Sequence, residues 1–295
     1  MARAALPRNA AVRGDAVGGV RIDERAHAKV NLGLSVLARR GDGYHEIESL
    51  MARVSLADDV RVARRGAGVA IVVDGADLPT DDRNLAVRAA RRYLEAAGAG
   101  DVGVAIELTK RIPIAAGLGG GSSDAAAVLR ALRVLVPADL ELDRLALELG
   151  SDVPFFLAGH AAALARGRGE RLEPVSLPKL ALVLAYPGEA VSAAEAYGAL
   201  QSFTSRPRLD ALLEKLRAGA EPGFVNALQP GVVRAYPVVR EVIKALRAEG
   251  LRGASMSGSG SCCLALAPDR AEAQDAAQRL RAAHPRWTVV AAESV

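Results

Sequence analysis

The sequence has few aromatic residues, few cysteines and no long apolar run. Aromatic side chains make up 3% of the 295 residues, so the core must be built from aliphatic side chains. The two cysteines, Cys262 and Cys263, are adjacent, which excludes an ordinary disulfide framework and favours a reducing, cytoplasmic setting. No apolar run approaches the roughly 18 residues of a membrane-spanning helix, so we expect no membrane partner.

The charge balance is only mildly basic. The formal net charge is +4, with 24% charged and 51% hydrophobic residues. The sequence lacks a dense Lys/Arg stripe interleaved with aromatic residues, so we expect no nucleic-acid partner. A small surplus of positive charge would suit an anionic small-molecule substrate. The hydrophobic content supports a packed core, and the length predicts about two domains.

The N-terminal 19 residues are rich in arginine and poor in acids, although basic, alanine-rich sequence runs through the whole chain. They carry Arg3, Arg8 and Arg13 but one acid, Asp15, and they lack the apolar block of a secretory signal. We expect residues 1–19 to be a disordered tail or the result of an upstream start codon chosen in error. An organelle transit peptide is the alternative interpretation.

Strand-like and helix-like hydrophobic patterns follow one another along the chain. Residues 20–28 and 30–37 resemble two strands, and the alanine-rich residues 124–135 resemble a helix. This mixture predicts an α/β (α+β) fold class. The composition changes little along the chain, and we divide it into an N-terminal domain over 20–165 and a C-terminal domain over 166–295.

A glycine-rich loop is the most informative segment of the sequence. It lies between a predicted strand and a predicted helix, and its four glycines leave backbone N–H groups uncovered by side chains. Two serines stand where the helix begins, and a helix N-terminus adds partial positive charge, so the segment suits a polyphosphate. The candidate nucleotide-binding residues are Pro113, Ile114, Ala115, Ala116, Gly117, Leu118, Gly119, Gly120, Gly121, Ser122 and Ser123.

Two well-known nucleotide-binding patterns do not match this loop. No Gly-Lys-Ser/Thr sequence follows, which excludes a Walker A loop. Ser122 stands where the dinucleotide-binding fingerprint requires its third glycine, which argues against a nicotinamide oxidoreductase. A glycine turn that binds nothing is the remaining alternative.

Three segments, in order, resemble the three motifs of the GHMP kinases, the family of galactokinase and of the homoserine, mevalonate and phosphomevalonate kinases. They are residues 28–32 (AKVNL), 113–124 and 254–260 (ASMSGSG). The resemblance implies a two-domain fold of mixed sheets and helices. It also implies ATP bound at the 113–123 loop, a substrate in the cleft between the domains, and Mg²⁺ that arrives with ATP. Ser123 is a candidate metal ligand, and no glutamate is assigned.

Two further stretches resemble one branch of this family, which acts on a cytidine diphosphate derivative. They are residues 40–46 (RGDGYHE) and 149–156 (LGSDVPFF). This resemblance implies that the γ-phosphoryl group of ATP moves to the 2-hydroxyl of a cytidine diphosphate derivative of methylerythritol, in the non-mevalonate pathway to isoprenoids.

The resemblance makes Lys29 and Asp152 the catalytic pair. Asp152 precedes an apolar run, where a partly desolvated carboxylate can accept a proton. Lys29 could lower the pKa of the substrate hydroxyl, hold Asp152 ionised or neutralise phosphate charge. The alternatives are a helix-capping or loop aspartate and a solvated strand lysine.

The same resemblance assigns substrate contacts. Tyr44 offers a face for stacking on a base, His45 can hydrogen-bond a cytosine edge, and Tyr197 stands where the family has a second stacking aromatic. Helix packing is the alternative for Tyr197. Asn31 is assigned to the substrate on resemblance alone.

Other functions remain open from the sequence. A GHMP kinase for another small alcohol, such as homoserine or a mevalonate derivative, would have no base to stack on Tyr44. A catalytically silent protein of the same fold that senses its ligand would not need both Lys29 and Asp152. The sequence leaves monomer and homodimer equally open.

Overall fold

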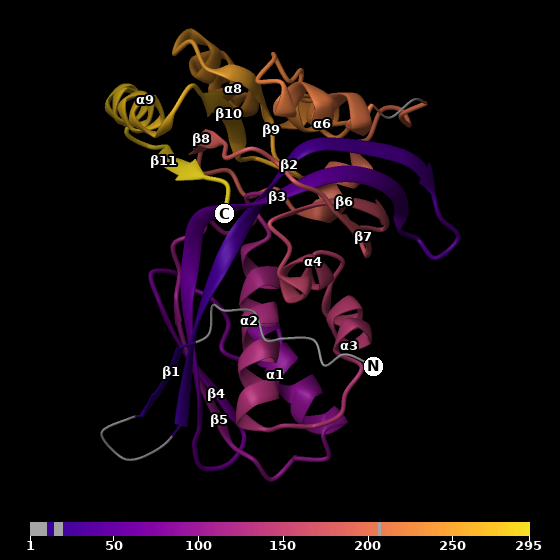
Figure 1. Ribbon diagram of the computed structural model, residues 1–295, viewed down its shortest axis with the longest axis vertical. Helices are drawn as coiled ribbons and strands as arrows, with labels where there is room; N and C mark the ends of the chain where they lie inside the picture. Colours follow the sequence, from indigo (N-terminus) through magenta and orange to yellow (C-terminus); the bar gives the residue numbers. More distant parts are fainter. Residues whose placement is uncertain (1–10, 15–19, 206–207) are drawn as a thin grey trace. The chain divides into compact units, whose positions relative to one another are not determined.

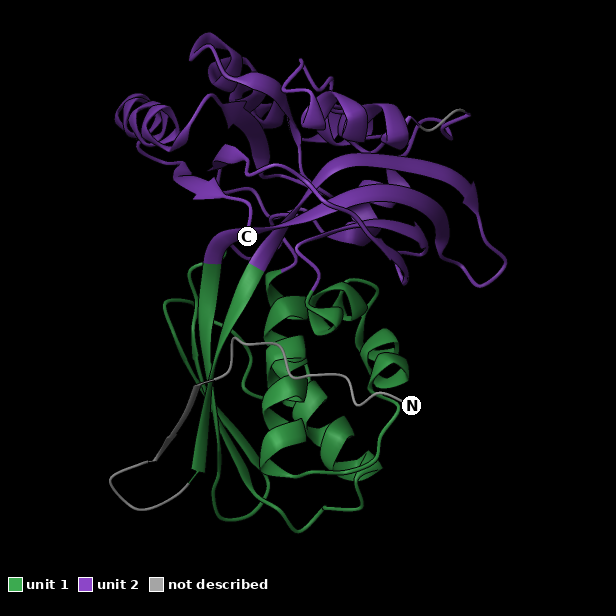
Figure 2. Cartoon of the chain, viewed as in Figure 1, with its two compact units in different colours: residues 1–27, 57–112, 120–159 green, residues 28–56, 113–119, 160–295 purple. Residues whose placement is uncertain are grey.

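The computed structural model describes residues 11–14, 20–205 and 208–295. These residues form two compact units that interleave along the chain (Figure 2). Unit 1 comprises residues 1–27, 57–112 and 120–159, and unit 2 comprises residues 28–56, 113–119 and 160–295. The expected division into domains over 20–165 and 166–295 stays a prediction.

The helices and strands alternate along the chain, as the pattern predicted (Figure 1). The strands are β1 (Ala11–Gly14), β2 (Val20–Arg39), β3 (His45–Arg64), β4 (Val69–Asp74), β5 (Val104–Thr109), β6 (Ala162–Gly167), β7 (Arg171–Pro174), β8 (Ala181–Tyr186), β9 (Arg252–Met256), β10 (Cys263–Ala267) and β11 (Thr288–Glu293). The helices are α1 (Leu85–Ala96), α2 (Gly120–Leu135), α3 (Leu142–Leu149), α4 (Val153–Ala158), α5 (Ala193–Gly198), α6 (Leu209–Arg217), α7 (Gln229–Ala235), α8 (Val238–Ala248) and α9 (Arg270–Ala283). Within the described ranges, no helix is long and apolar enough to cross a membrane.

Part of the expected N-terminal tail is described. Ala11–Gly14 forms β1, which pairs antiparallel with Val20–Asp23 of β2. The other residues of 1–19 lie outside the described residues, so the expectation about the tail as a whole stays a prediction.

Unit 1 contains a β–α–β crossover and a small helical layer. Strand β4 pairs with β5 in parallel, and α1 is the connection that a parallel pair requires. Strand β5 also pairs antiparallel with the end of β3. Helix α2 packs against α1, α3 and α4, and most of its side chains are buried because alanines allow close helix contacts. From Ser123 onward the helix is therefore held by a packed core.

Unit 2 is built around a four-stranded antiparallel sheet in the order β11–β8–β10–β9. Apolar side chains of α7, α8 and α9 pack with the sheet into one aliphatic core. Residues 47–52 of β3 pair with β6, and β6 pairs with β7. The expected mixed sheets with helices are confirmed.

Strand β2 and helix α2 differ in extent from the prediction. Strand β2 runs without interruption from Val20 to Arg39, where two strands were expected with Lys29 between them. The sheet tolerates this lysine because its ammonium group finds a buried hydrogen-bond acceptor. Helix α2 begins at Gly120 rather than at Asp124, so Ser122 lies inside the first turn.

Candidate active site

Lys29 and Asn31 form a buried polar relay on β2, in unit 2. The side chain of Lys29 is 4% exposed, and its Nζ donates a hydrogen bond to Asn31 Oδ1 at 2.6 Å. Asn31 Nδ2 donates to Ser49 Oγ on β3 at 2.7 Å, and this hydroxyl donates to Gly33 O at 2.8 Å. Side chains two residues apart on a strand point to the same face, which is why Lys29 and Asn31 meet. The relay fixes the position of the ammonium group.

The three family motifs contribute neighbouring backbone to this relay. Asn31 N donates to Ser257 Oγ at 3.1 Å, and this hydroxyl donates to Gly117 O at 3.2 Å. Lys29 N donates to Leu118 O at 3.0 Å. Asn226 holds the third motif from its other side, because its Nδ2 donates to Met256 O and Gly258 O, each at 2.8 Å. Segments some 90 and 230 residues apart in sequence thus meet in unit 2.

Two glycines at this junction leave no room for a side chain. A Cβ at Gly258 would lie 3.0 Å from Asn31 Oδ1 and 3.2 Å from Lys29 Nζ. A Cβ at Gly117 would overlap Ser257 O and lie 2.8 Å from Gly260 N. Both glycines have positive φ, +54° and +75°, which other residues rarely adopt. The motif glycines here are required by close backbone contact.

The substitution Gly117→Ala is expected to destabilise the folded protein by at least ~2 kcal/mol, because backbone strain and overpacking each cost roughly 1–3 kcal/mol. Thermal or urea unfolding measures this. Gly100→Ala is the matched control, because Gly100 has open space around its Cβ position and no positive φ. Equal stability of the two variants would show that the backbone around Gly117 has room for a methyl group.

A short turn positions Tyr44. Arg40 N donates to Tyr44 O at 2.8 Å, and Tyr44 N donates to Asp42 Oδ1 at 3.1 Å. Gly43 provides the positive φ of +85° that closes the turn. Tyr44 is 48% exposed, and the guanidinium of Arg168 lies 4.5 Å from its ring centroid, a cation–π contact. An exposed aromatic face is thus held in a fixed position.

His45 and Tyr197 are brought together from β3 and α5. Their ring centroids are 4.7 Å apart and nearly parallel, with Phe203 at 6.5 Å from His45. Partial burial lowers the pKa of His45, and the nearby charge of Arg39 lowers it further. The imidazole is therefore neutral at pH 7, with one donor and one acceptor nitrogen. Tyr197 also packs against the core of unit 2, so both interpretations of this residue stay predictions.

Asp152 lies in unit 1, directly before α4. Its carboxylate does not cap this helix, which removes one of the alternatives for it. The next residues, Val153, Pro154 and Phe155, are buried and anchor the aspartate backbone. Ser122 and Ser123 belong to the same unit at the start of α2. The pairing of Asp152 with Lys29 stays a prediction, because each unit is described by itself.

A buried ionic cluster in unit 1 was missed by the sequence analysis. Lys110 Nζ donates to Asp124 Oδ2 at 2.7 Å and also to Asp58 Oδ2. Burial raises the pKa of Asp124 to about 7. Burial alone would lower the pKa of Lys110, but the two carboxylates offset it and raise the pKa. The rarity of lysine in this chain was the one sequence signal available for this cluster.

The carboxyl group of Asp124 is expected to titrate near pH 7, against its ordinary value of 3.8. Since the folded-state pKa is the higher one, folding favours the protonated form. This group's contribution to the free energy of unfolding is therefore largest below about pH 4 and falls as the pH rises towards about 7. Carboxyl ¹³C NMR, with Asp124→Asn to assign the signal, measures the pKa. A midpoint near 4 would contradict the expectation.

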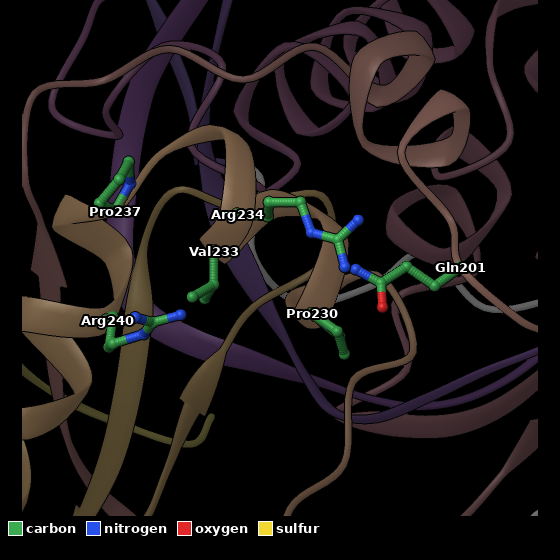
Figure 3. A pocket seen from close by; sticks show the side chains of 6 residues that line it. All are labelled: Gln201, Pro230, Val233, Arg234, Pro237 and Arg240. Atoms are coloured by element: carbon green, nitrogen blue, oxygen red, sulfur yellow. The ribbon is translucent and has the colours of Figure 1, made fainter.

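A pocket of ≈ 410 Å³ lies elsewhere in unit 2 (Figure 3). In Figure 3 the side chain of Arg234 extends toward Gln201. None of the expected site residues lines this pocket, whose lining residues are Gln201, Pro230, Val233, Arg234, Pro237 and Arg240.

Cys262 and Cys263 are buried, and burial raises the pKa of Cys262 to about 12, so neither is a nucleophile at neutral pH.

Comparison with known proteins agrees with the motifs. Residues 84–160 match the GHMP kinases N terminal domain, and residues 190–286 match the GHMP kinases C terminal domain. The chain is 50% identical over 276 residues to the 4-diphosphocytidyl-2-C-methyl-D-erythritol kinase of Deinococcus radiodurans, with 91% of each chain covered. It is 48% identical over 268 residues to the kinase of the same name from Thermus thermophilus, with 90% of this chain and 95% of the relative covered.

A solved structure is similar over the same extent. The crystal structure of a 4-(cytidine 5'-diphospho)-2C-methyl-D-erythritol kinase superposes with a TM-score of 0.82 at 47% identity, covering 92% of this chain and 98% of the other. This chain therefore belongs to the GHMP kinases, which are ATP-dependent phosphotransferases. The expected family and fold class are confirmed.

Proposed function

We propose that this protein transfers the γ-phosphoryl group of ATP to the 2-hydroxyl of 4-diphosphocytidyl-2-C-methyl-D-erythritol, in the non-mevalonate pathway to isoprenoid precursors. The observation that carries the proposal is the convergence in unit 2 of the three motifs around Lys29, Asn31 and Gly258. The aromatic pair His45 and Tyr197 adds a surface suited to a base. The names of the two relatives and of the solved structure support the same substrate.

ATP would bind along residues 113–123. Positive φ at Gly117 and Gly119 turns the backbone so that N–H groups are uncovered, and α2 then begins at Gly120. The first N–H groups of a helix have no partner within it and attract phosphate oxygens. The loop thereby offers both donors and partial positive charge to the polyphosphate.

Magnesium would arrive with ATP. Among the described residues, no group of three His, Cys, Asp or Glu side chains is placed to hold a metal ion. This fits Mg²⁺, which usually takes phosphate oxygens, water and only one or two protein oxygens. Ser123 is buried and Ser122 is half-buried at the start of α2, and we propose that a hydroxyl of this pair completes the coordination. The ion would neutralise the phosphate charge.

Lys29 and Asp152 would carry the chemistry. Asp152 accepts the proton of the substrate hydroxyl as the hydroxyl attacks the γ-phosphorus. The Lys29 ammonium group, which is held by its hydrogen bond to Asn31, stabilises the negative charge that develops on the oxygens of the transferred phosphoryl group. Phosphoryl transfer depends chiefly on positioning and electrostatics, and a relay that holds one cation in place supplies both.

The cytosine would be recognised by Tyr44, His45 and Tyr197. The neutral imidazole of His45 can exchange hydrogen bonds with the base edge without first losing a proton. The tyrosine rings provide stacking faces. We also propose a cytoplasmic protein, monomeric or homodimeric, without a nucleic-acid partner.

The substitution Tyr44→Ala is expected to weaken binding of the cytidine substrate by ~1–3 kcal/mol, which is the value of one base stack. ATP affinity should hardly change, because the phosphates are bound by the backbone of another segment. Isothermal titration with each ligand measures both affinities. Equal losses for both ligands would mean that Tyr44 supports the fold and does not stack.

The function is tested by offering three alcohols in parallel with Mg-ATP: the cytidylylated methylerythritol, homoserine and mevalonate phosphate. Phosphorylation of the first alone is expected, because the other two have no base to stack. Preferential turnover of either of the others would overturn the substrate assignment. Binding of the cytidine substrate without turnover would identify a silent sensor of the same fold.

A further inference from the structure

Two of the five lysines in this chain are buried, and the proposed chemistry uses one of them. Lys29 belongs to the relay described above. Lys110 lies in unit 1 just after the end of β5, and its side chain is 5% exposed. A buried ammonium group without a catalytic role needs another explanation, because removing a charge from water is costly.

Lys110 is held between two carboxylates from different elements. Its Nζ contacts Asp58 on β3 and donates to Asp124 Oδ2 on α2 at 2.7 Å. Asp58 Oδ1 in turn accepts the backbone N–H groups of Arg111 and Ile112 at 2.5 and 2.8 Å. Asp58 therefore fixes the backbone that leaves β5, which is the chain entering the glycine-rich loop.

The other end of the same loop is held by the same cation. Asp124 is the fifth residue of α2, and Gly120 is the first. A Cβ at Gly120 would lie 3.3 Å from Lys110 Nζ and 3.0 Å from Ile112 Cγ2, so the helix start is in close contact with the ammonium group. The entry and the exit of residues 113–119 are thus joined through Lys110.

The energetics of the cluster indicate that it positions the backbone rather than stabilises the fold. Desolvation largely offsets the attraction within a buried ion cluster, and apolar replacements of similar volume are often neutral or stabilising. In addition, Asp124 Oδ1 is buried and has no hydrogen-bond partner among the described residues, which is itself unfavourable. The cluster instead fixes the relative position of three backbone segments, because each of its hydrogen bonds holds one segment against the next.

We propose that Lys110, Asp58 and Asp124 are positioning residues for the nucleotide, which hold the two stems of the glycine-rich loop at the separation that the ATP phosphates require. This inference rests on the proposed function in one respect, that residues 113–123 bind ATP. None of the three residues needs to touch the substrate. Their effect is transmitted through Gly120 and through the backbone of Arg111 and Ile112.

The test compares an apolar and a conservative variant. The double variant Lys110→Met with Asp124→Leu removes the cation and one of its two carboxyl partners and keeps the volume, while Asp58 keeps its two backbone hydrogen bonds. Asp124→Asn keeps an oxygen that accepts from Lys110. We expect the double variant to raise the KM for ATP roughly 10- to 100-fold, since small misplacements are costly in phosphoryl transfer. In the Asp124→Asn variant, the KM for ATP should stay within about threefold of that of the unaltered chain.

The readout separates position from stability. The KM for the cytidine substrate should change little in either variant, and binding of a fluorescent ADP analogue should weaken in parallel with the KM for ATP. The melting temperature should change little in Asp124→Asn but fall in the double variant, because the buried Asp58 loses its cation, so kinetics are measured well below that temperature. Lys179→Met with Glu293→Gln is the matched control, because it removes an ion pair of 3.0 Å whose lysine is 71% exposed. This control should leave every parameter unchanged.

Several outcomes would overturn the inference. A folded double variant with an unaltered KM for ATP would do so, as would an equal rise in both KM values. If the double variant does not fold, a stable Asp124→Asn variant whose KM for ATP rises well beyond threefold would also count against it. Because the analogue binds without any alcohol, a wrong substrate assignment leaves this test intact, whereas failure of the unaltered chain to bind nucleotide overturns both.

Discussion

The variant Asp152→Asn is expected to lose activity by ~10²–10⁴-fold in kcat, which is the usual contribution of a general base. The amide keeps the shape of the side chain and removes its capacity to accept the proton. Since Asp152 does not cap α4, the helix should be unaffected. Both substrates should still bind, because a proton acceptor acts mainly in the transition state.

Steady-state kinetics with direct binding measurements would check this expectation. Asp143→Asn is a suitable control, because Asp143 is an exposed aspartate in the first turn of α3, in the same unit. A folded Asp152→Asn variant with near-normal kcat would falsify the catalytic assignment. The reaction would then depend on the loop and Mg²⁺ alone, without a side-chain base.

Removal of the Lys29 side chain is the second change with a large expected effect. Lys29→Ala should lower kcat by about 10²–10³-fold, as loss of one fixed donor to a developing negative charge does. It also leaves Asn31 Oδ1 without the donor that it has at 2.6 Å. For this reason Lys29→Met, which fills the volume, should be measured beside it. The control is Lys244→Ala, an exposed lysine on α8.

The double variant tests whether the two residues act together. If Lys29 and Asp152 serve one proton transfer, the double variant should be little worse than the worse single variant. Full additivity of the two free-energy losses would instead mean independent roles, with Lys29 stabilising the phosphate and Asp152 acting alone. Activity of Lys29→Met near that of the unaltered chain would exclude an electrostatic role for the lysine.

Much of the local structure follows from the sequence. Hydrophobic periodicity and a continuous apolar run predict α1, α3 and β8, because each of these elements buries one face or the run itself. Strand β4 was expected over Val69–Val73 as a buried strand, but only Ile71 in it is buried, because the strand has a solvent-exposed face. The apolar spacing of residues 142–149 predicts a short helix before Gly150, and α3 has these bounds. The residues that begin α2 were not predicted, because glycine has poor helix propensity and only contact with Ile112 and Lys110 explains Gly120 in that place.

The candidate site was also predicted only in part from the sequence. The glycines and serines of 113–124 by themselves indicated a polyphosphate site. The kinase activity came from the resemblance of 28–32, 113–124 and 254–260 to the three family motifs. They could not reveal that Asn31 binds Lys29 or that Gly258 lies against both side chains. The contacts of Gly258 join residues more than 200 positions apart, which local patterns cannot reveal. The bond from Lys29 to Asn31 joins residues only two positions apart, but it depends on a rotamer that strand periodicity does not fix.

The Asp58–Lys110–Asp124 cluster was decided by tertiary structure alone. In the sequence, these are three ordinary charged residues on a strand, after a strand and on a helix. Only the packing of β3, β5 and α2 removes them from water, and burial then turns ordinary charges into a fixed cluster and raises the pKa of Asp124 to about 7. The sequence determined the chemistry that is available to this protein, and the fold determined which of its charged groups are held in place to support that chemistry.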